Sequence, residues 1–72
     1  MSSKYIVRLK EDATEDELNN SIKSFESSGG TISRHHTLFK GFTGEIPDNK
    51  ITAFEATPGI EAVEKDQTVH IN

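Results

Sequence analysis

Three histidines, His35, His36 and His70, carry the side chains of this sequence best suited to binding a metal ion. His35 and His36 are neighbours in a segment that favours a strand, where successive side chains point to opposite faces, so the two cannot easily share one ion. His70 could join one of them, but two histidines without a cysteine or a carboxylate cluster form a poor ligand set. We therefore predict no metal site, with one histidine partly packed and one solvated.

A serine, a histidine and an aspartate occur in most short chains, so their presence alone does not indicate catalysis. None of the serine and histidine combinations has the spacing of a known nucleophile motif. Gly29 and Gly30 are followed by Thr-Ile-Ser, without the arginine that an anion-binding loop for acyl-phosphate hydrolysis would need. The sequence thus predicts a protein that is not an enzyme and that uses no cofactor.

Two carboxylates, Glu64 and Asp66, stand at alternate positions of a segment that favours a strand, so they lie on one side of it. One interpretation is a solvated strand end. The other is that each carboxylate meets the N-terminus of a helix on a partner, where free N–H groups and the macrodipole favour an anion. Residues 67–72 follow directly and contain no Asp, Glu, Lys or Arg, which makes the second interpretation worth keeping.

The length of 72 residues places the chain near the lower limit for one hydrophobic core, so we predict a single domain, 1–72, of modest stability. There is no cysteine to form a disulfide. A net charge of −4 with scattered basic residues argues against a nucleic-acid partner. The N-terminus lacks the pattern of a signal peptide and no window is apolar enough to span a bilayer, which predicts a soluble chain without a membrane partner.

The N-terminal half predicts a strand and a helix. Residues 4–9 alternate, with Tyr5, Val7 and Leu9 on one face and Ile6 on the other. Thr14 and Glu17 form a capping box for a helix over 15–27, and the glycines at 29 and 30 end it. Apolar residues follow at helical spacing at Leu18, Ile22 and Phe25.

The C-terminal half predicts a hairpin, a shorter helix and a last strand. Residues 31–38 alternate weakly and 40–46 more clearly, so we expect two paired strands. The first would have Ile32, Arg34, His36 and Leu38 on one side, and the second Phe42, Gly44 and Ile46. Asp48 or Asn49 is expected to cap the short helix, with Ile51 and Phe54 facing inward. Thr43 and Glu45 are expected to be solvated. Residues 60–66 form the last strand, where Ile60 and Val63 require a bulge or a two-sided environment.

The resulting order, β-α-β-β-α-β, predicts an α+β, ferredoxin-like fold: a four-stranded antiparallel sheet with two helices on one face. The other sheet face would then be uncovered, with Ile6 pointing towards it. We interpret this uncovered face as a natural docking surface.

Four stretches in order along the whole chain resemble the subtilisin propeptide-like protease inhibitors, of the fungal proteinase A inhibitor and yeast proteinase B inhibitor type. They are KYIVRLK at 4–10, GGTI at 29–32, KGFTGEI at 40–46 and VEKDQTVHIN at 63–72. The resemblance implies the same ferredoxin-like domain, docked by its open sheet face on two surface helices of a subtilisin-like serine protease. Glu64 and Asp66 would then cap those two helices.

The resemblance also implies a role for the C-terminal tail, which we define as residues 67–72. The tail would lie in the substrate cleft, with Val69 and Ile71 in two pockets, His70 pointing mostly outward and Asn72 in the primary specificity pocket. An extended tail can add as a strand to the substrate-binding edge, gaining main-chain hydrogen bonds. Because the chain ends where cleavage would occur, the expected inhibition is competitive and non-covalent.

We therefore expect a cytoplasmic, monomeric inhibitor of subtilisin-like serine proteases, which could also act as a folding chaperone for a subtilisin domain. The alternative hypothesis is a non-inhibitory ferredoxin-like module that binds a metal, around His35 and His70, or a protein partner on its sheet.

Overall fold

The computed structural model describes residues 1–66, and the tail, 67–72, lies outside the described residues. The described chain folds as β1 (Ser2–Leu9), α1 (Glu15–Ser27), β2 (Thr31–His35), β3 (Gly41–Pro47), α2 (Ile51–Glu55) and β4 (Ile60–Lys65). This is the predicted β-α-β-β-α-β order. Neither helix in residues 1–66 is long and apolar enough to cross a membrane.

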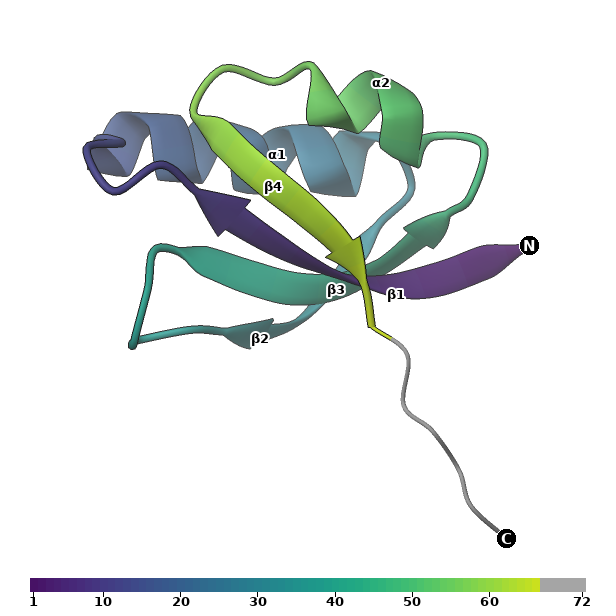
Figure 1. Cartoon of the computed structure of the whole chain (residues 1–72). Helices are drawn as coiled ribbons and strands as arrows, with labels where there is room; N and C mark the ends of the chain where they lie inside the picture. Colours follow the sequence, from purple (N-terminus) through teal and green to yellow (C-terminus); the bar gives the residue numbers. More distant parts are fainter. Residues whose placement is uncertain (67–72) are drawn as a thin grey trace, which may run out of the picture.

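The four strands form one antiparallel sheet in the order β2-β3-β1-β4. Both helices pack on the same face of this sheet, and the opposite face has no layer of secondary structure from residues 1–66 over it (Figure 1). The predicted ferredoxin-like α+β architecture is therefore confirmed. We call the uncovered side the open face.

The core lies between the sheet and the helices, as the alternation of β1 and β3 predicts. Tyr5, Val7 and Leu9 are all buried on the helix side of β1. Three aromatic rings join the layers: the Phe25 ring of α1 meets those of Phe42 and Phe54 edge to face, each at a centroid distance of 5.2 Å. Edge-to-face contacts of this kind stabilise a core beyond the area that they bury.

Helix α1 begins and ends where the sequence predicts. The Glu17 N–H donates to Thr14 Oγ1 at 3.1 Å and the Thr14 N–H donates to Glu17 Oε1 at 3.0 Å, which completes the capping box. After the helix, Gly29 adopts a φ of +90°, a left-handed conformation that glycine takes without steric cost.

Helix α2 differs from the prediction at its start. Ile51 is the first helical residue and Lys50 precedes it without a side-chain cap, so the expected caps, Asp48 or Asn49, are wrong. The Asp48 carboxylate instead accepts a hydrogen bond of 3.0 Å from the Tyr5 hydroxyl. The Asp48 side chain, which the sequence predicted as the cap of α2, is therefore used in a contact with β1.

Both edge strands contain an irregularity in register. In β2, Ile32 pairs with Gly44 but Arg34 pairs with Thr43, so Ser33 is an extra residue. Ile32 packs against the core while Arg34 reaches the other face, and the predicted common face of Ile32, Arg34, His36 and Leu38 is wrong. Strand β2 also stops at His35. In β4 the shift leaves Glu61 extra, which supplies the bulge that one interpretation of Ile60 and Val63 required.

Candidate functional site

The open face is built from the outward positions of β1. Lys4, Ile6 and Arg8 alternate with the buried Tyr5, Val7 and Leu9, so strand geometry sends them away from the helices. Ile6 is half-buried even there, because Thr43 of β3 and Glu64 of β4 are its partners on either side. The face therefore has an apolar centre with a charged residue of β1 on each side of it.

Glu64 and Asp66 both lie at the open face, as their alternate spacing predicts. Glu64 pairs with Ile6 and is exposed, while the Asp66 N–H donates to the Lys4 carbonyl at 2.8 Å and so continues the ladder one residue beyond β4. The two carboxylates stand on the last residues before the tail. The tail itself, with the predicted binding residues Val69, His70, Ile71 and Asn72, lies outside the described residues.

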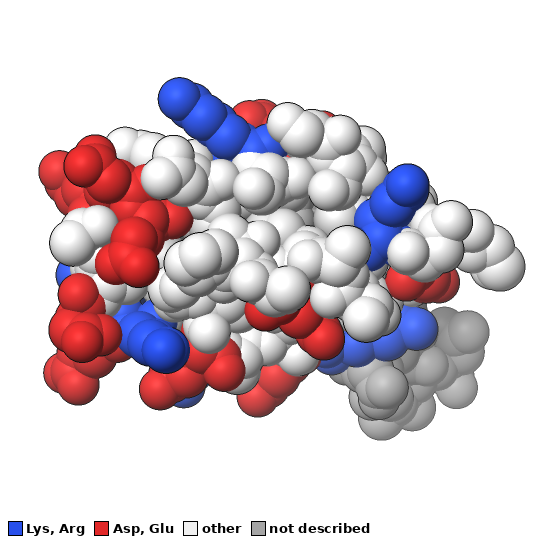
Figure 2. All heavy atoms as spheres, turned by 90° about the horizontal axis from the view of Figure 1, so that it is seen from above, with Lys and Arg blue, Asp and Glu red and all other residues white. Residues whose placement is uncertain are grey.

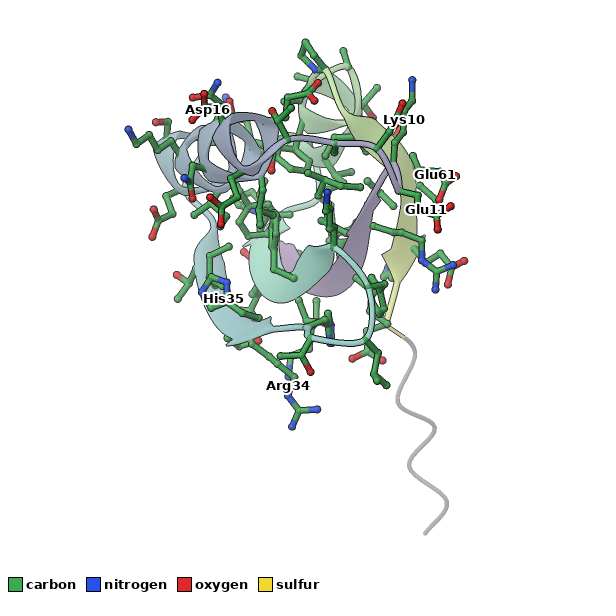
Figure 3. All side chains as sticks on the ribbon, turned by 90° about the vertical axis from the view of Figure 1, so that its left-hand side faces the viewer. Lys10, Glu11, Asp16, Arg34, His35 and Glu61 are labelled. Carbon is green, nitrogen blue, oxygen red and sulfur yellow. The ribbon has the colours of Figure 1, made fainter. Side chains whose placement is uncertain are left out.

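A shallow hollow occupies the middle of the open face. It mixes the apolar Ile6 with polar and charged groups from β1, β2, β3 and the residues that follow β2 and β4, chiefly Lys4, Arg34, His36, Thr43 and Asp66. The Arg34 side chain extends from β2 away from the helix layer (Figure 3). Two cationic side chains and one imidazole thus surround the aliphatic Ile6. Such a surface is complementary to a protein surface that is partly apolar and partly anionic.

Sequence reasoning missed a cluster of side chains on this face. Thr43 was expected to be solvated but is only 8% exposed, since its hydroxyl and His36 Nε2 are hydrogen-bonded at 2.6 Å. The His36 ring stacks on Phe39 at 4.7 Å, and the Arg8 guanidinium lies 4.7 Å from the centroid of the same Phe39 ring. The sequence did contain a signal for this cluster: the aromatic Phe39 follows His36 closely in the predicted hairpin, and Arg8 occupies an outward position of the neighbouring strand.

The two described histidines have different surroundings, as predicted. His36 is half-buried in the cluster, and His35 is exposed on β2 (Figure 3). Within residues 1–66 no three His, Asp or Glu side chains are grouped to hold a metal ion. The predicted partner for His35, His70, lies outside the described residues, so the proposed pair stays untested.

The helix side of the molecule has a different character. Figure 2 looks down on it and shows acidic side chains gathered towards one end, with uncharged surface across the middle and basic side chains standing apart. The open face combines its charges with Ile6 and an aromatic ring instead, so the two sides present different chemistry to a partner.

Residues 4–72 match the family of peptidase inhibitor I9. The chain belongs to this family. The match covers nearly the whole sequence and includes most of the strand β1, the acidic pair and the tail. The predicted resemblance to subtilisin propeptide-like inhibitors is therefore confirmed.

Named relatives of this I9 chain agree with the family. It is 32% identical to serine proteinase inhibitor IA-1 of Pleurotus ostreatus, over 94% of this chain and 95% of that protein. It is 33% identical to protease B inhibitor 2 of Saccharomyces cerevisiae, over the full length of both chains. An uncharacterised protein of Schizosaccharomyces pombe, C338.12, is 38% identical over 97% of this chain and 94% of its own.

A solved structure shares the fold alone. A phospho-2-dehydro-3-deoxyheptonate aldolase from Thermotoga maritima superposes with a TM-score of 0.71 and 24% identity, over 90% of this chain and 20% of the aldolase chain. The same architecture thus occurs within an enzyme, which illustrates that the fold does not define an activity. The function of this chain follows from its family instead: it belongs to a family of peptidase inhibitors and is not an enzyme.

Proposed function

We propose that this I9 chain inhibits subtilisin-like serine proteases competitively and non-covalently, docking its open face on the protease while the tail occupies the substrate cleft. The observation that carries the proposal is the position of Glu64 and Asp66. They stand on the open face, directly before the tail, in a chain of the inhibitor family. A body that docks through this face would bring the start of the tail to the same side of the interface.

The acidic pair is proposed to contact two helix N-termini of the protease. Glu64 is exposed and Asp66 half-buried, and both belong to the open face: Glu64 pairs with Ile6, and Asp66 lines the same hollow as Lys4 and Ile6. Helix N-termini attract anions through their free N–H groups and the macrodipole. Two such contacts would fix the direction in which the body sits, and thereby the direction in which the tail enters the cleft.

In the tail, Val69 and Ile71 are proposed to fill two substrate pockets and Asn72 the primary specificity pocket, with His70 directed outward. Alternate side chains of an added strand enter pockets on one side, which fits this spacing. The bound tail is proposed to mimic a cleavage product in the cleft. We further propose that the free inhibitor is a cytoplasmic monomer and that the same docking helps a subtilisin domain to fold.

The test is inhibition of a bacterial subtilisin by the full chain and by a chain without residues 69–72. We expect the full chain to raise the apparent KM without changing kcat, and the shortened chain to lose inhibition because the cleft is no longer occupied. A thermal melt serves as the control, since every helix and strand of the described residues precedes the deletion. Full inhibition by the shortened chain would contradict the role of the tail.

A further inference from the structure

We infer that the β2–β3 loop, residues 36–40, is a second contact element for the protease and that Leu38 is its anchor. The inference rests on the proposed function and adds a contact site at the end of the open face away from Asp66. The observation behind it is that Leu38 is 98% exposed, while His36 before it and Phe39 after it are both in contact with the body.

The loop is fixed to the body on both sides of Leu38. Before it, the His36 N–H donates to the Gly41 carbonyl at 3.1 Å and the His36 side chain is hydrogen-bonded to Thr43. After it, the Phe39 ring lies between His36 and Arg8. The Leu9 N–H also donates to the Lys40 carbonyl at 2.8 Å.

These contacts make Leu38 a preorganised apolar group. A side chain on a mobile loop loses conformational freedom when a partner fixes it, and this cost reduces affinity. Leu38 would lose little backbone freedom, because His36 and Phe39 already fix the loop on either side of it. Burying it against a partner would therefore contribute most of the hydrophobic free energy of a leucine to binding.

The loop is continuous with the open face and lies on its side of the sheet. Arg8 and Thr43 are outward residues of β1 and β3, and the loop folds onto both of them. The loop meets β1 at Leu9, whereas Asp66, the last described residue, meets β1 at Lys4. Five residues of an antiparallel strand span about 17 Å, so the loop that carries Leu38 and the residue Asp66 lie near opposite ends of one face.

That separation suits a single protein interface. A standard interface buries about 800 Å² on each partner, which corresponds to a patch roughly 30 Å across. A protease surface that received the acidic pair and the tail at one end would extend to Leu38 at the other. Two anchors at opposite ends of the face would also resist rotation of the body about the tail.

The surroundings of Leu38 define the chemistry of the patch that it contacts. Leu38 and Phe39 share a hollow with Arg8 and with two acidic side chains, Glu11 and Glu61. Glu11 and Glu61 lie together beside the ends of β1 and β4 (Figure 3). The complementary protease surface is an apolar patch with a lysine or arginine beside it, and a protease with acidic groups there would bind more weakly.

The experiment compares the inhibition constants of the full chain and its L38S variant against a bacterial subtilisin. We expect L38S to raise the inhibition constant 10-fold to 100-fold, about the loss of one buried leucine, mainly through faster dissociation. The L38M variant keeps the apolar volume and should stay within a few-fold of the unmodified chain. The T37A variant, altered at the exposed neighbour, should not differ from it.

The melting temperatures of all four proteins should agree, because Leu38 makes almost no contact within the described residues. Raising the salt concentration should leave the L38S effect in place, since the lost contact is apolar. An unchanged inhibition constant for L38S, while the unmodified chain inhibits, would overturn the inference and leave the proposed function standing. An unmodified chain that fails to inhibit at all would overturn both.

Discussion

The hydrogen bond between Tyr5 and Asp48 joins β1 to the segment that leads into α2, 43 residues further along the chain. It affects both groups. Burial, followed by the hydrogen bond and the charge of Asp48, raises the pKa of the Tyr5 hydroxyl above its usual value of 10.0. Hydrogen bonds donated by Ser3 and Tyr5 lower the pKa of the Asp48 carboxyl below 3.8. Each shift links protonation to folding.

The two shifts predict the direction of the stability change at each end of the pH range. Asp48 has a depressed pKa when folded, so its contribution is present above pH 3.8 and is lost as the pH falls through the folded pKa. Tyr5 has a raised pKa, so its contribution is present below pH 10.0 and is lost as the pH rises through the folded pKa. Urea unfolding from pH 2 to 11 measures the loss of stability at both the acidic and the alkaline end.

The Y5F variant is the matched control for these two pH-dependent losses of stability, since it keeps the buried ring and removes the hydroxyl. We expect it to abolish the tyrosine contribution at high pH and to weaken the fall in stability at low pH, where Asp48 would retain the Ser3 contact. Parallel pH profiles for Y5F and the unmodified chain would show that the Tyr5–Asp48 bond does not couple folding to pH.

At the scale of elements, α1 depends on its first turn. The capping box supplies partners for N–H groups that a helix leaves free, and Glu15, Asp16 and Glu17 place negative charge at the positive end of the helix dipole. The helix carries Phe25 into the centre of the core, so its start affects the packing of the whole sheet.

Replacing the cap tests this dependence. The T14A variant should lower the free energy of unfolding by about 0.5–2 kcal/mol, because the Glu17 N–H would lose its acceptor. The T14S variant keeps an oxygen at the same place and should lose much less. Denaturant titration followed by circular dichroism measures both. Equal stability of T14A and the unmodified chain would mean that water replaces the cap without cost.

The two irregular edge strands have a consequence beyond their own register. Unpaired N–H and C=O groups on the outer side of an edge strand can pair with another chain. The bulges at Ser33 in β2 and Glu61 in β4 interrupt the regular spacing of those groups. Because of these bulges, both edges of the sheet are poorly suited to pairing with a strand of another chain. This favours docking through the open face instead.

At the scale of the whole molecule, the small core limits stability. Globular proteins have free energies of unfolding of roughly 0.05–0.15 kcal/mol per residue, which gives about 4–11 kcal/mol for 72 residues. A protease inhibitor of such stability is itself exposed to proteolysis whenever it opens, and cleavage follows the population of the open form when reclosing is fast.

Inhibition should therefore decay with time, and the decay should follow stability. For a variant such as T14A, each 1 kcal/mol lost raises the open population about fivefold and should shorten the recovery of subtilisin activity by the same factor. The initial inhibition constant should not change, since Thr14 caps α1, and α1 packs on the face of the sheet opposite the open face. Recovery times measured over hours test this, and equal times for the two chains would exclude opening as the route of degradation.

Local features of this fold were readable from the sequence because they depend on backbone periodicity. The alternation of Tyr5, Val7 and Leu9, the capping box at Thr14 and the left-handed Gly29 each involve residues within a few positions of one another. The spacing of Glu64 and Asp66 likewise predicted that both would lie on one side of β4, as they do. Their role and that of the tail remain predictions.

Other features were decided only by tertiary structure, because they require partners from distant parts of the chain. Asp48 binds Tyr5 instead of capping α2, and Thr43 is covered by His36 instead of being solvated. The Phe39 ring finds Arg8 only once β1 and β3 are paired. Sequence alone determined the elements, their order and the family. Contacts between elements decided which polar groups on the open face have partners within the described residues, and they left the apolar Leu38 exposed.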